Sequence, residues 1–105
     1  MAMTNMGINN ITHLKDGPAD GSLRASSADQ DASMGSGAVA FGNNTIASAP
    51  DSIAIGNNVI TSAPNSSATG YFTQASGYTS HAEGSNTTAS SDCSHAEGNQ
   101  TTASG

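Results

Sequence analysis

The chain has 105 residues, a net charge of −6 and a mean hydropathy of −0.34. Gly, Ala, Ser, Thr and Asn supply 67 residues, whereas Leu, Ile, Val and Phe supply only 12, which is too few for the core of an ordinary globular domain. Residues 25–105 carry six Asp and Glu and no Lys or Arg, which argues against nucleic acids and anionic membrane surfaces as partners.

Residues 1–37 lie outside any repeat and hold most of the scattered bulky side chains. A turn-rich stretch at 16–21 separates Leu14 from Leu23, and residues 25–37 are rich in Ser, Ala, Asp and Gly. This pattern predicts an irregular attachment segment and linker over 1–37, with a loose tail that caps the following coil as the alternative. The candidate attachment residues are Ile8, Ile11, Leu14 and Leu23.

Signals for export, membrane insertion and disulfide formation are not found in the sequence. Residues 1–6 contain no basic residue and no apolar run, so we expect no secretory signal there. No stretch approaches the roughly 20 apolar residues that a membrane-spanning helix needs. Cys93 is the single cysteine, which excludes an intrachain disulfide.

Residues 38–105 consist of five copies of a 14-residue repeat. The copies run 38–51, 52–65, 66–79, 80–93 and 94–105, and the last stops two residues short. Every copy has an alanine, a glycine two residues later and a serine six residues after the glycine. The glycines are Gly42, Gly56, Gly70, Gly84 and Gly98. Such repetition is typical of a solenoid, in which stacked copies bury each other's faces.

Each copy opens with five residues whose side chains alternate between two faces, as in Ser52–Gly56, and this is typical of a β-strand. The glycine is expected to allow a turn, a short Thr- and Ala-rich stretch such as Thr87–Ser90 follows, and turn residues close the copy. We predict an all-β parallel β-roll solenoid of 14-residue coils spaced about 4.8 Å apart. The tight interior is expected to hold Ala40, Ala54, Ala68, Ala82 and Ala96.

The opposite face of the same strands changes along the chain. The first two copies carry Val39, Phe41, Ile53 and Ile55, the third carries Ser67 and Thr69, and the last two carry His81, Glu83, His95 and Glu97. A thin roll cannot bury the apolar stripe of the first two copies by itself. The stripe therefore predicts self-association, commonly through closed cyclic symmetry.

The stretches Ala38–Gly42 and Ser52–Gly56 resemble the head repeats of trimeric autotransporter adhesins, the YadA-like or Hep/Hag class. This resemblance implies a left-handed parallel β-roll and a homotrimer of three rolls about a threefold axis. The trimer interface that it implies consists of Val39, Phe41, Ile53, Ile55, His81, Glu83, His95 and Glu97.

The later copies resemble a related variant of the repeat. Ser80–Gly84 with Thr87–Ser90, and Ser94–Gly98 with Thr101–Gly105, resemble the SHAEG–TTASG repeats of phage and prophage tail proteins. This implies a structural virion protein, the proximal part of a trimeric phage tail fibre. Its N-terminal segment would attach to a tail or baseplate protein, and the roll would form the shaft. The alternatives are a trimeric adhesin head fragment on the bacterial surface, binding a host receptor, and a self-assembling filament subunit.

The His–Glu pairs are the conspicuous polar groups of the repeat. Under the implied trimer, His of one chain would hydrogen-bond Glu of the next, giving structural rings around the axis. The alternative is a metal or anion site on that axis, because imidazole and carboxylate both bind metals. We favour the structural rings and predict no metal and no cofactor.

No residue constellation indicates an enzyme. Cys93 and His95 stand two residues apart, but histidine recurs at this position of the repeat, so we interpret it as structural. Tyr71, Phe72 and Tyr78 cluster in the third copy. They form either a surface patch for a sugar or receptor, or packing on the outside of the roll.

Overall fold

The computed structural model describes residues 14–16, 22–25 and 34–105, and these residues form two β-sheets and no helix. The first sheet contains β1 (Leu14–Asp16), β2 (Leu23–Ala25), β3 (Val39–Asn43), β5 (Ile53–Asn57), β7 (Ser67–Tyr71), β9 (His81–Ser85) and β11 (His95–Asn99). The second contains β4 (Ile46–Ala47), β6 (Ile60–Thr61), β8 (Gln74–Ala75), β10 (Thr88–Ala89) and β12 (Thr102–Ala103). Long and short strands therefore alternate from residue 39 onward.

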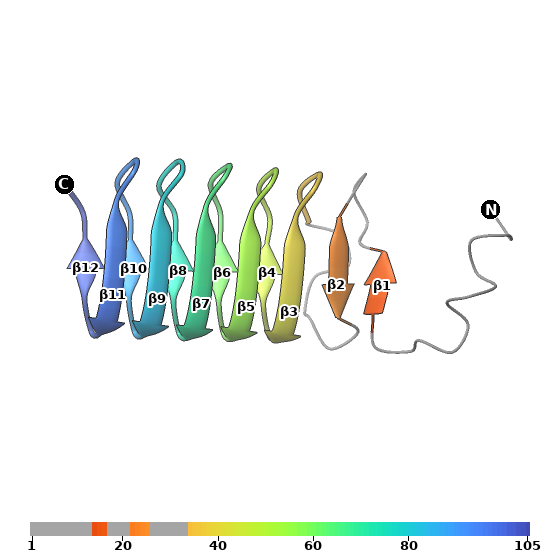
Figure 1. Cartoon of the computed structure of the whole chain (residues 1–105), viewed down its shortest axis with the longest axis horizontal. Coiled ribbons are helices and arrows are strands. Elements are labelled where there is room, and N and C mark those ends of the chain that lie inside the picture. The colour runs from red at the N-terminus through yellow and green to blue at the C-terminus, as the bar shows by residue number, and fades with distance from the viewer. Residues whose placement is uncertain (1–13, 17–21, 26–33) are drawn as a thin grey trace, which may run out of the picture.

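The coils stack as two parallel ladders, one on each side of the roll (Figure 1). From β3 to β11 each residue of the long-strand sheet pairs with the residue 14 positions further on, so that Ala40 lies opposite Ala54. The short strands obey the same rule, with Ile46 opposite Ile60. The predicted parallel solenoid of 14-residue coils is confirmed.

Small side chains fill the space between the two sheets. Ala40, Ala54, Ala68 and Ala82 are fully buried, and Ala96 in the last coil is 4% exposed. The facing short strands add Ala47, Thr61, Ala75 and Ala89, all fully buried. No side chain larger than valine is completely buried in the described part of the chain, so the roll is thin.

The repeated glycine lies inside the long strand, and the turn comes two residues later. Gly70 is the fourth residue of β7 and has a φ of +122°. A Cβ at this position would lie 2.0 Å from the backbone oxygen of Gly84 in the next coil. The prediction that this glycine makes the turn is therefore wrong, because close approach of stacked backbones requires it within the strand.

Each coil turns at two corners, and a residue with left-handed backbone stands at each corner. After the long strands these residues are Asn44, Asn58, Phe72, Asn86 and Gln100, with φ between 53° and 59°. After the short strands they are Asp51, Asn65, Thr79 and Cys93, with φ between 55° and 60°. Asn and Asp tolerate this conformation, whereas it costs Phe72 and Thr79 about 1–2 kcal/mol each. The stacking of coils thus imposes the corner on residues that do not favour it.

Buried hydroxyl groups divide into two kinds. Ser52 Oγ donates to the Ala49 carbonyl at 2.7 Å, and Ser66 Oγ donates to the Ala63 carbonyl at 2.6 Å, which stabilises the corners before β5 and β7. The other kind has no hydrogen-bond partner and consists of the Oγ1 atoms of Thr45, Thr73 and Thr87. Val59 occupies the equivalent position of the second coil and is fully buried, so this position accepts an apolar side chain of similar shape.

Two short strands lie within the segment that was predicted to be irregular. β1 pairs antiparallel with β2, and β2 pairs in parallel with β3, placing Leu23 opposite Val39. The long-strand sheet therefore continues beyond the first repeat. Met34 is 6% exposed and packs with the alanine core, so packing of the roll begins before residue 38.

Candidate functional site

The outer face of the long-strand sheet carries two columns of side chains in register. The first column consists of Val39, Ile53, Ser67, His81 and His95, and the second of Phe41, Ile55, Thr69, Glu83 and Glu97. All eight residues predicted for the trimer interface lie in these columns. That this face is an interface between chains stays a prediction.

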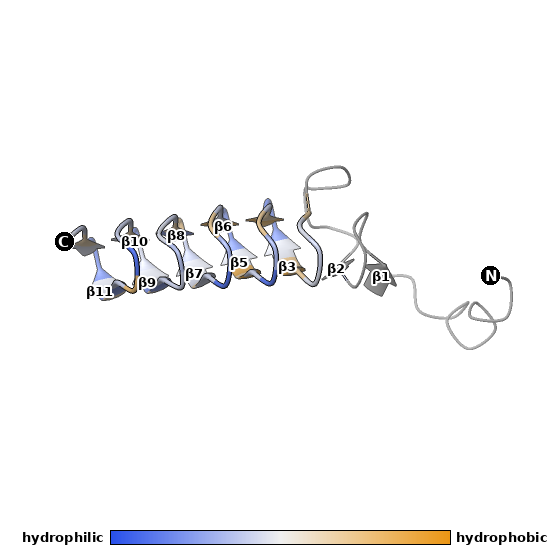
Figure 2. Ribbon diagram, turned by 90° about the horizontal axis from the view of Figure 1, so that it is seen from above, coloured by the Kyte–Doolittle hydropathy of each residue, from blue (hydrophilic) through white to orange (hydrophobic). Residues whose placement is uncertain are grey.

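The columns are apolar at β3 and β5 and polar at β9 and β11 (Figure 2). Ile53 and Ile55 are 40% and 41% exposed, while Val39 and Phe41 are half-buried. Ile53 and Ile55 thus form an exposed apolar surface on one face of β5, which favours contact with another protein surface.

At the polar end, Glu83 lies between two imidazoles. Its Oε1 is 3.4 Å from His81 Nε2, and its Oε2 is 3.8 Å from His95 Nε2. His95 Nε2 is also 3.5 Å from Glu97 Oε1, and the two imidazole rings meet edge to face with centroids 4.9 Å apart. Histidine and glutamate therefore pair within one chain; the predicted pairing between chains stays a prediction.

Ser67 joins this group from the neighbouring strand, which the sequence reasoning missed. Its Oγ lies 2.6 Å from His81 Nδ1. The signal was available, because Ser67 stands one period of 14 residues before His81 and hence beside it in the column. The backbone N–H groups of Ser67 and His81 donate to the Ser80 and Ser94 carbonyls of the adjacent coils. The serine thus fixes the ring of His81 and turns its Nε2 toward Glu83.

The neighbours of Glu83 lower the pKa of its carboxyl. The side-chain interaction with Glu97, and then that with the His81 ring, lowers the pKa of Glu83 below its usual value, and attraction to the two imidazoles adds to this. A carboxylate at this point presents free lone pairs toward both imidazoles.

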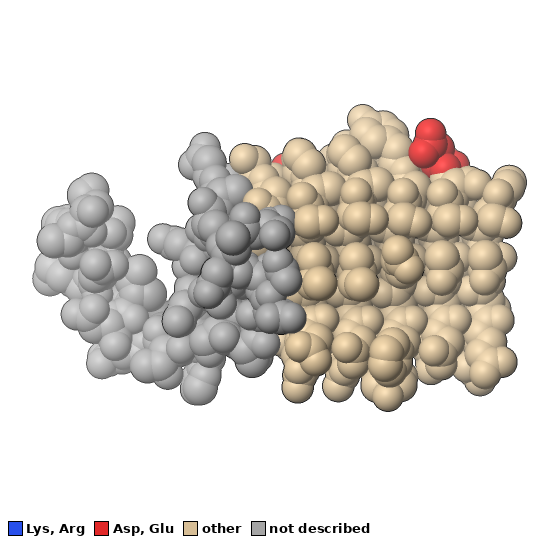
Figure 3. Space-filling view, turned by 180° about the vertical axis from the view of Figure 1, so that it is seen from behind, with Lys and Arg blue, Asp and Glu red and all other residues tan. Residues whose placement is uncertain are grey.

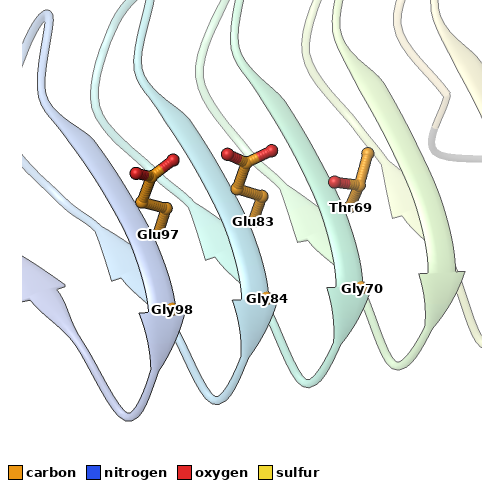
Figure 4. Close-up of a pocket in the computed structure, with 6 residues that line it drawn as sticks. All are labelled: Thr69, Gly70, Glu83, Gly84, Glu97 and Gly98. Atoms are coloured by element: carbon orange, nitrogen blue, oxygen red, sulfur yellow. The ribbon is translucent and has the colours of Figure 1, made fainter.

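A shallow hollow borders the second column, lined by Thr69, Gly70, Glu83, Gly84, Glu97 and Gly98. Figure 4 shows that Thr69, Glu83 and Glu97 stand in a row on successive strands and point to the same side. Figure 3 shows the opposite, short-strand face, where acidic atoms appear only at the upper edge of the roll. Because the repeated glycines have no side chains, the carboxylates are open to solvent beside them.

The other predicted residues lie elsewhere. Ile8 and Ile11 lie outside the described residues, Leu14 lies in β1 and Leu23 in β2. The predicted interior alanines line the inner face of the long-strand sheet. The attachment role of the first four stays a prediction.

The three aromatic residues of the third coil do not form one cluster. Tyr71 ends β7 and its ring meets that of Phe72 edge to face, with centroids 4.6 Å apart. Tyr78 lies in the other corner, between β8 and β9, and all three side chains are about half exposed. Cys93 is exposed too, with its Sγ 3.1 Å from Thr79 Oγ1 one coil earlier.

Among the described residues there is no helix with the length and apolar character to cross a membrane.

The family model for the YadA head domain repeat matches residues 35–58 with two copies. No curated protein and no solved structure gives a significant match to the chain. The family match covers the coils that bear Val39, Phe41, Ile53 and Ile55, so the resemblance to YadA-like head repeats is confirmed.

Proposed function

We propose that this chain, which carries YadA-like head repeats, is a structural segment of a trimeric surface appendage. Head repeats of this kind belong to adhesin-type structural proteins. The observation that carries the proposal is the exposed, in-register pair Ile53 and Ile55 on the outer face of β5. A single roll leaves this surface in water, and threefold association buries it.

The geometry of the roll suits this association. Each long strand presents its outer side chains at the same two register positions, so the columns run straight along the roll. Three copies can then meet along the full length of the columns, with apolar contact at β3 and β5 and polar contact at β9 and β11. The result is a rigid rod in which every coil has the same environment in all three chains.

The test is the absolute mass of the purified chain, measured by light scattering over a range of concentrations. The chain mass is 10.3 kDa, and we expect a constant mass near three times this value. A mass of one chain at all concentrations would overturn the trimer. Particles that grow with concentration would favour the filament alternative.

Two appendages fit this role. The copies Ser80–Gly84 and Ser94–Gly98, with their resemblance to phage tail repeats, favour the shaft of a tail fibre that is attached through residues 1–37. The match at residues 35–58 favours an adhesin head on the cell surface equally well. Immunogold labelling with antibodies to residues 38–105 separates them. Label on purified virion tails supports the fibre, and label on intact cells supports the adhesin.

A further inference from the structure

We propose that His81, Glu83 and His95 form a binding site for one divalent first-row transition metal ion per chain. Each offers a ligand atom, and these atoms all lie within 4.8 Å of one another. The site goes beyond the proposed trimer, because all three ligands come from the same chain.

The ligand atoms lie near the separations found around a metal ion, with no two of them more than 4.8 Å apart. An ion with bonds of about 2.1 Å holds tetrahedral ligands about 3.4 Å apart. His81 Nε2 lies 3.4 Å from Glu83 Oε1, and His95 Nε2 lies 3.8 Å from Glu83 Oε2. Small changes of the side-chain torsions bring the three ligands around one ion.

The chemistry of the ligands selects the kind of ion. Two imidazoles and a carboxylate are a common zinc ligand set that leaves a fourth position for water. Mg²⁺ and Ca²⁺ prefer oxygen ligands, so two imidazoles disfavour them. Zn²⁺, Co²⁺ and Ni²⁺ accept both donor types.

Ser67 supplies the outer support that metal-binding histidines usually have. Its contact with His81 Nδ1 at 2.6 Å leaves Nε2 as the nitrogen that faces Glu83. Partners of this kind orient the imidazole and raise the affinity for the metal. His95 stands beside His81 in the same column, so the parallel register itself brings the two rings together.

The repeat provides matched variants for the test. At the same register positions β7 carries Ser67 and Thr69, so His81→Ser, Glu83→Thr and His95→Ser each copy a residue that this fold already accommodates. Asp92→Asn is the control, because Asp92 lies in a corner, where its Oδ1 accepts from the Tyr78 N–H. Circular dichroism verifies that each variant retains its strands.

The experiment uses the full chain without a histidine tag. Zn²⁺ binding is measured by isothermal titration, and Co²⁺ binding by the visible absorption that tetrahedral coordination produces. We expect one ion per chain, no competition by excess Mg²⁺ or Ca²⁺, and loss of binding in His95→Ser and Glu83→Thr. Ser67→Ala should lower the affinity about tenfold, and Asp92→Asn should leave it unchanged.

Several results would overturn the site. These are no Zn²⁺ binding, unchanged affinity in folded His95→Ser and Glu83→Thr, or a stoichiometry of one ion per three chains. The double variant Ile53→Ser/Ile55→Thr separates this proposal from the trimer. Because one chain supplies all the ligands, the variant should bind the ion even as a monomer.

Discussion

The coils around β3 and β5 and those around β9 and β11 have the same interior and opposite outer faces. Ala40 and Ala82 are both fully buried and occupy the same register position. On the outer face, however, Ile53 and Ile55 correspond to His81 and Glu83, two coils later. The backbone is repeated while the surface chemistry changes from apolar to charged.

This difference separates what folds the chain from what the chain contacts. The interior tolerates only small side chains, since the two sheets are close and the stacked backbones touch at the glycines. The outer positions face solvent in a single roll and are free to vary. One scaffold thus presents an apolar surface at one end and a polar ligand set at the other.

The largest effect is expected from breaking the shared interior at a glycine. Gly70→Ala places a Cβ 2.0 Å from the Gly84 oxygen, at a backbone position with φ +122°. We expect a loss of more than about 4 kcal/mol of folding free energy, measured by thermal unfolding at fixed chain concentration. Gly98→Ala is the matched control, since its Cβ meets only Thr101 Cγ2 at 3.5 Å. Equal destabilisation by both would show that φ alone, without the close approach, requires the glycine.

The second-largest effect is expected from a side chain that is too large for the interior of the roll. Ala68→Val adds two methyl groups between fully buried Ala54 and Ala82, and we expect a cost of about 1–3 kcal/mol. Thr69→Val, on the outer face of the same strand, should change the unfolding temperature little. If the two variants melt alike, the division into a strict interior and a permissive outer face is wrong.

The exposed isoleucines of β5 can be replaced by the polar residues that β7 carries at the same register positions. Ile53→Ser/Ile55→Thr copies Ser67 and Thr69 and removes the exposed apolar surface. Each isoleucine is about 40% exposed, so its burial on association contributes about 1 kcal/mol per chain. We expect light scattering to show a shift from three chains to one at low micromolar concentration. An unchanged mass would place the interface elsewhere, and Ile53→Val should keep the assembly.

The smallest expected effect is an increase in folding stability. Thr87 Oγ1 is buried with no hydrogen-bond partner, and Val59 already occupies the equivalent position. Thr87→Val removes the unpaired hydroxyl while keeping the shape, which should add about 1 kcal/mol of stability by thermal unfolding. Thr87→Ser keeps the hydroxyl and loses the methyl group, so it should destabilise. A Thr87→Val protein that is less stable than the parent would mean that the hydroxyl is paired in solution.

The sequence determined the period of the fold, the strand positions and the buried alanines. It could do so because parallel in-register stacking makes the structural repeat equal to the sequence repeat, and alternation fixes which face each residue takes. The long strands begin one residue later than the five-residue stretches suggested, as Ile53–Asn57 shows against Ser52–Gly56. The eight outer residues were also placed in two columns by the same rule.

Only the tertiary structure decided the side-chain contacts between coils and the backbone conformation at the corners. It placed Phe72, Thr79 and Cys93 in left-handed backbone, which their own preferences oppose, because the stacked neighbours impose the corner. It also brought Ser67 Oγ to His81 and set Glu83 between two imidazoles. Such contacts depend on side-chain torsions across strands, and a one-dimensional pattern records which residues are neighbours but not which of their atoms meet.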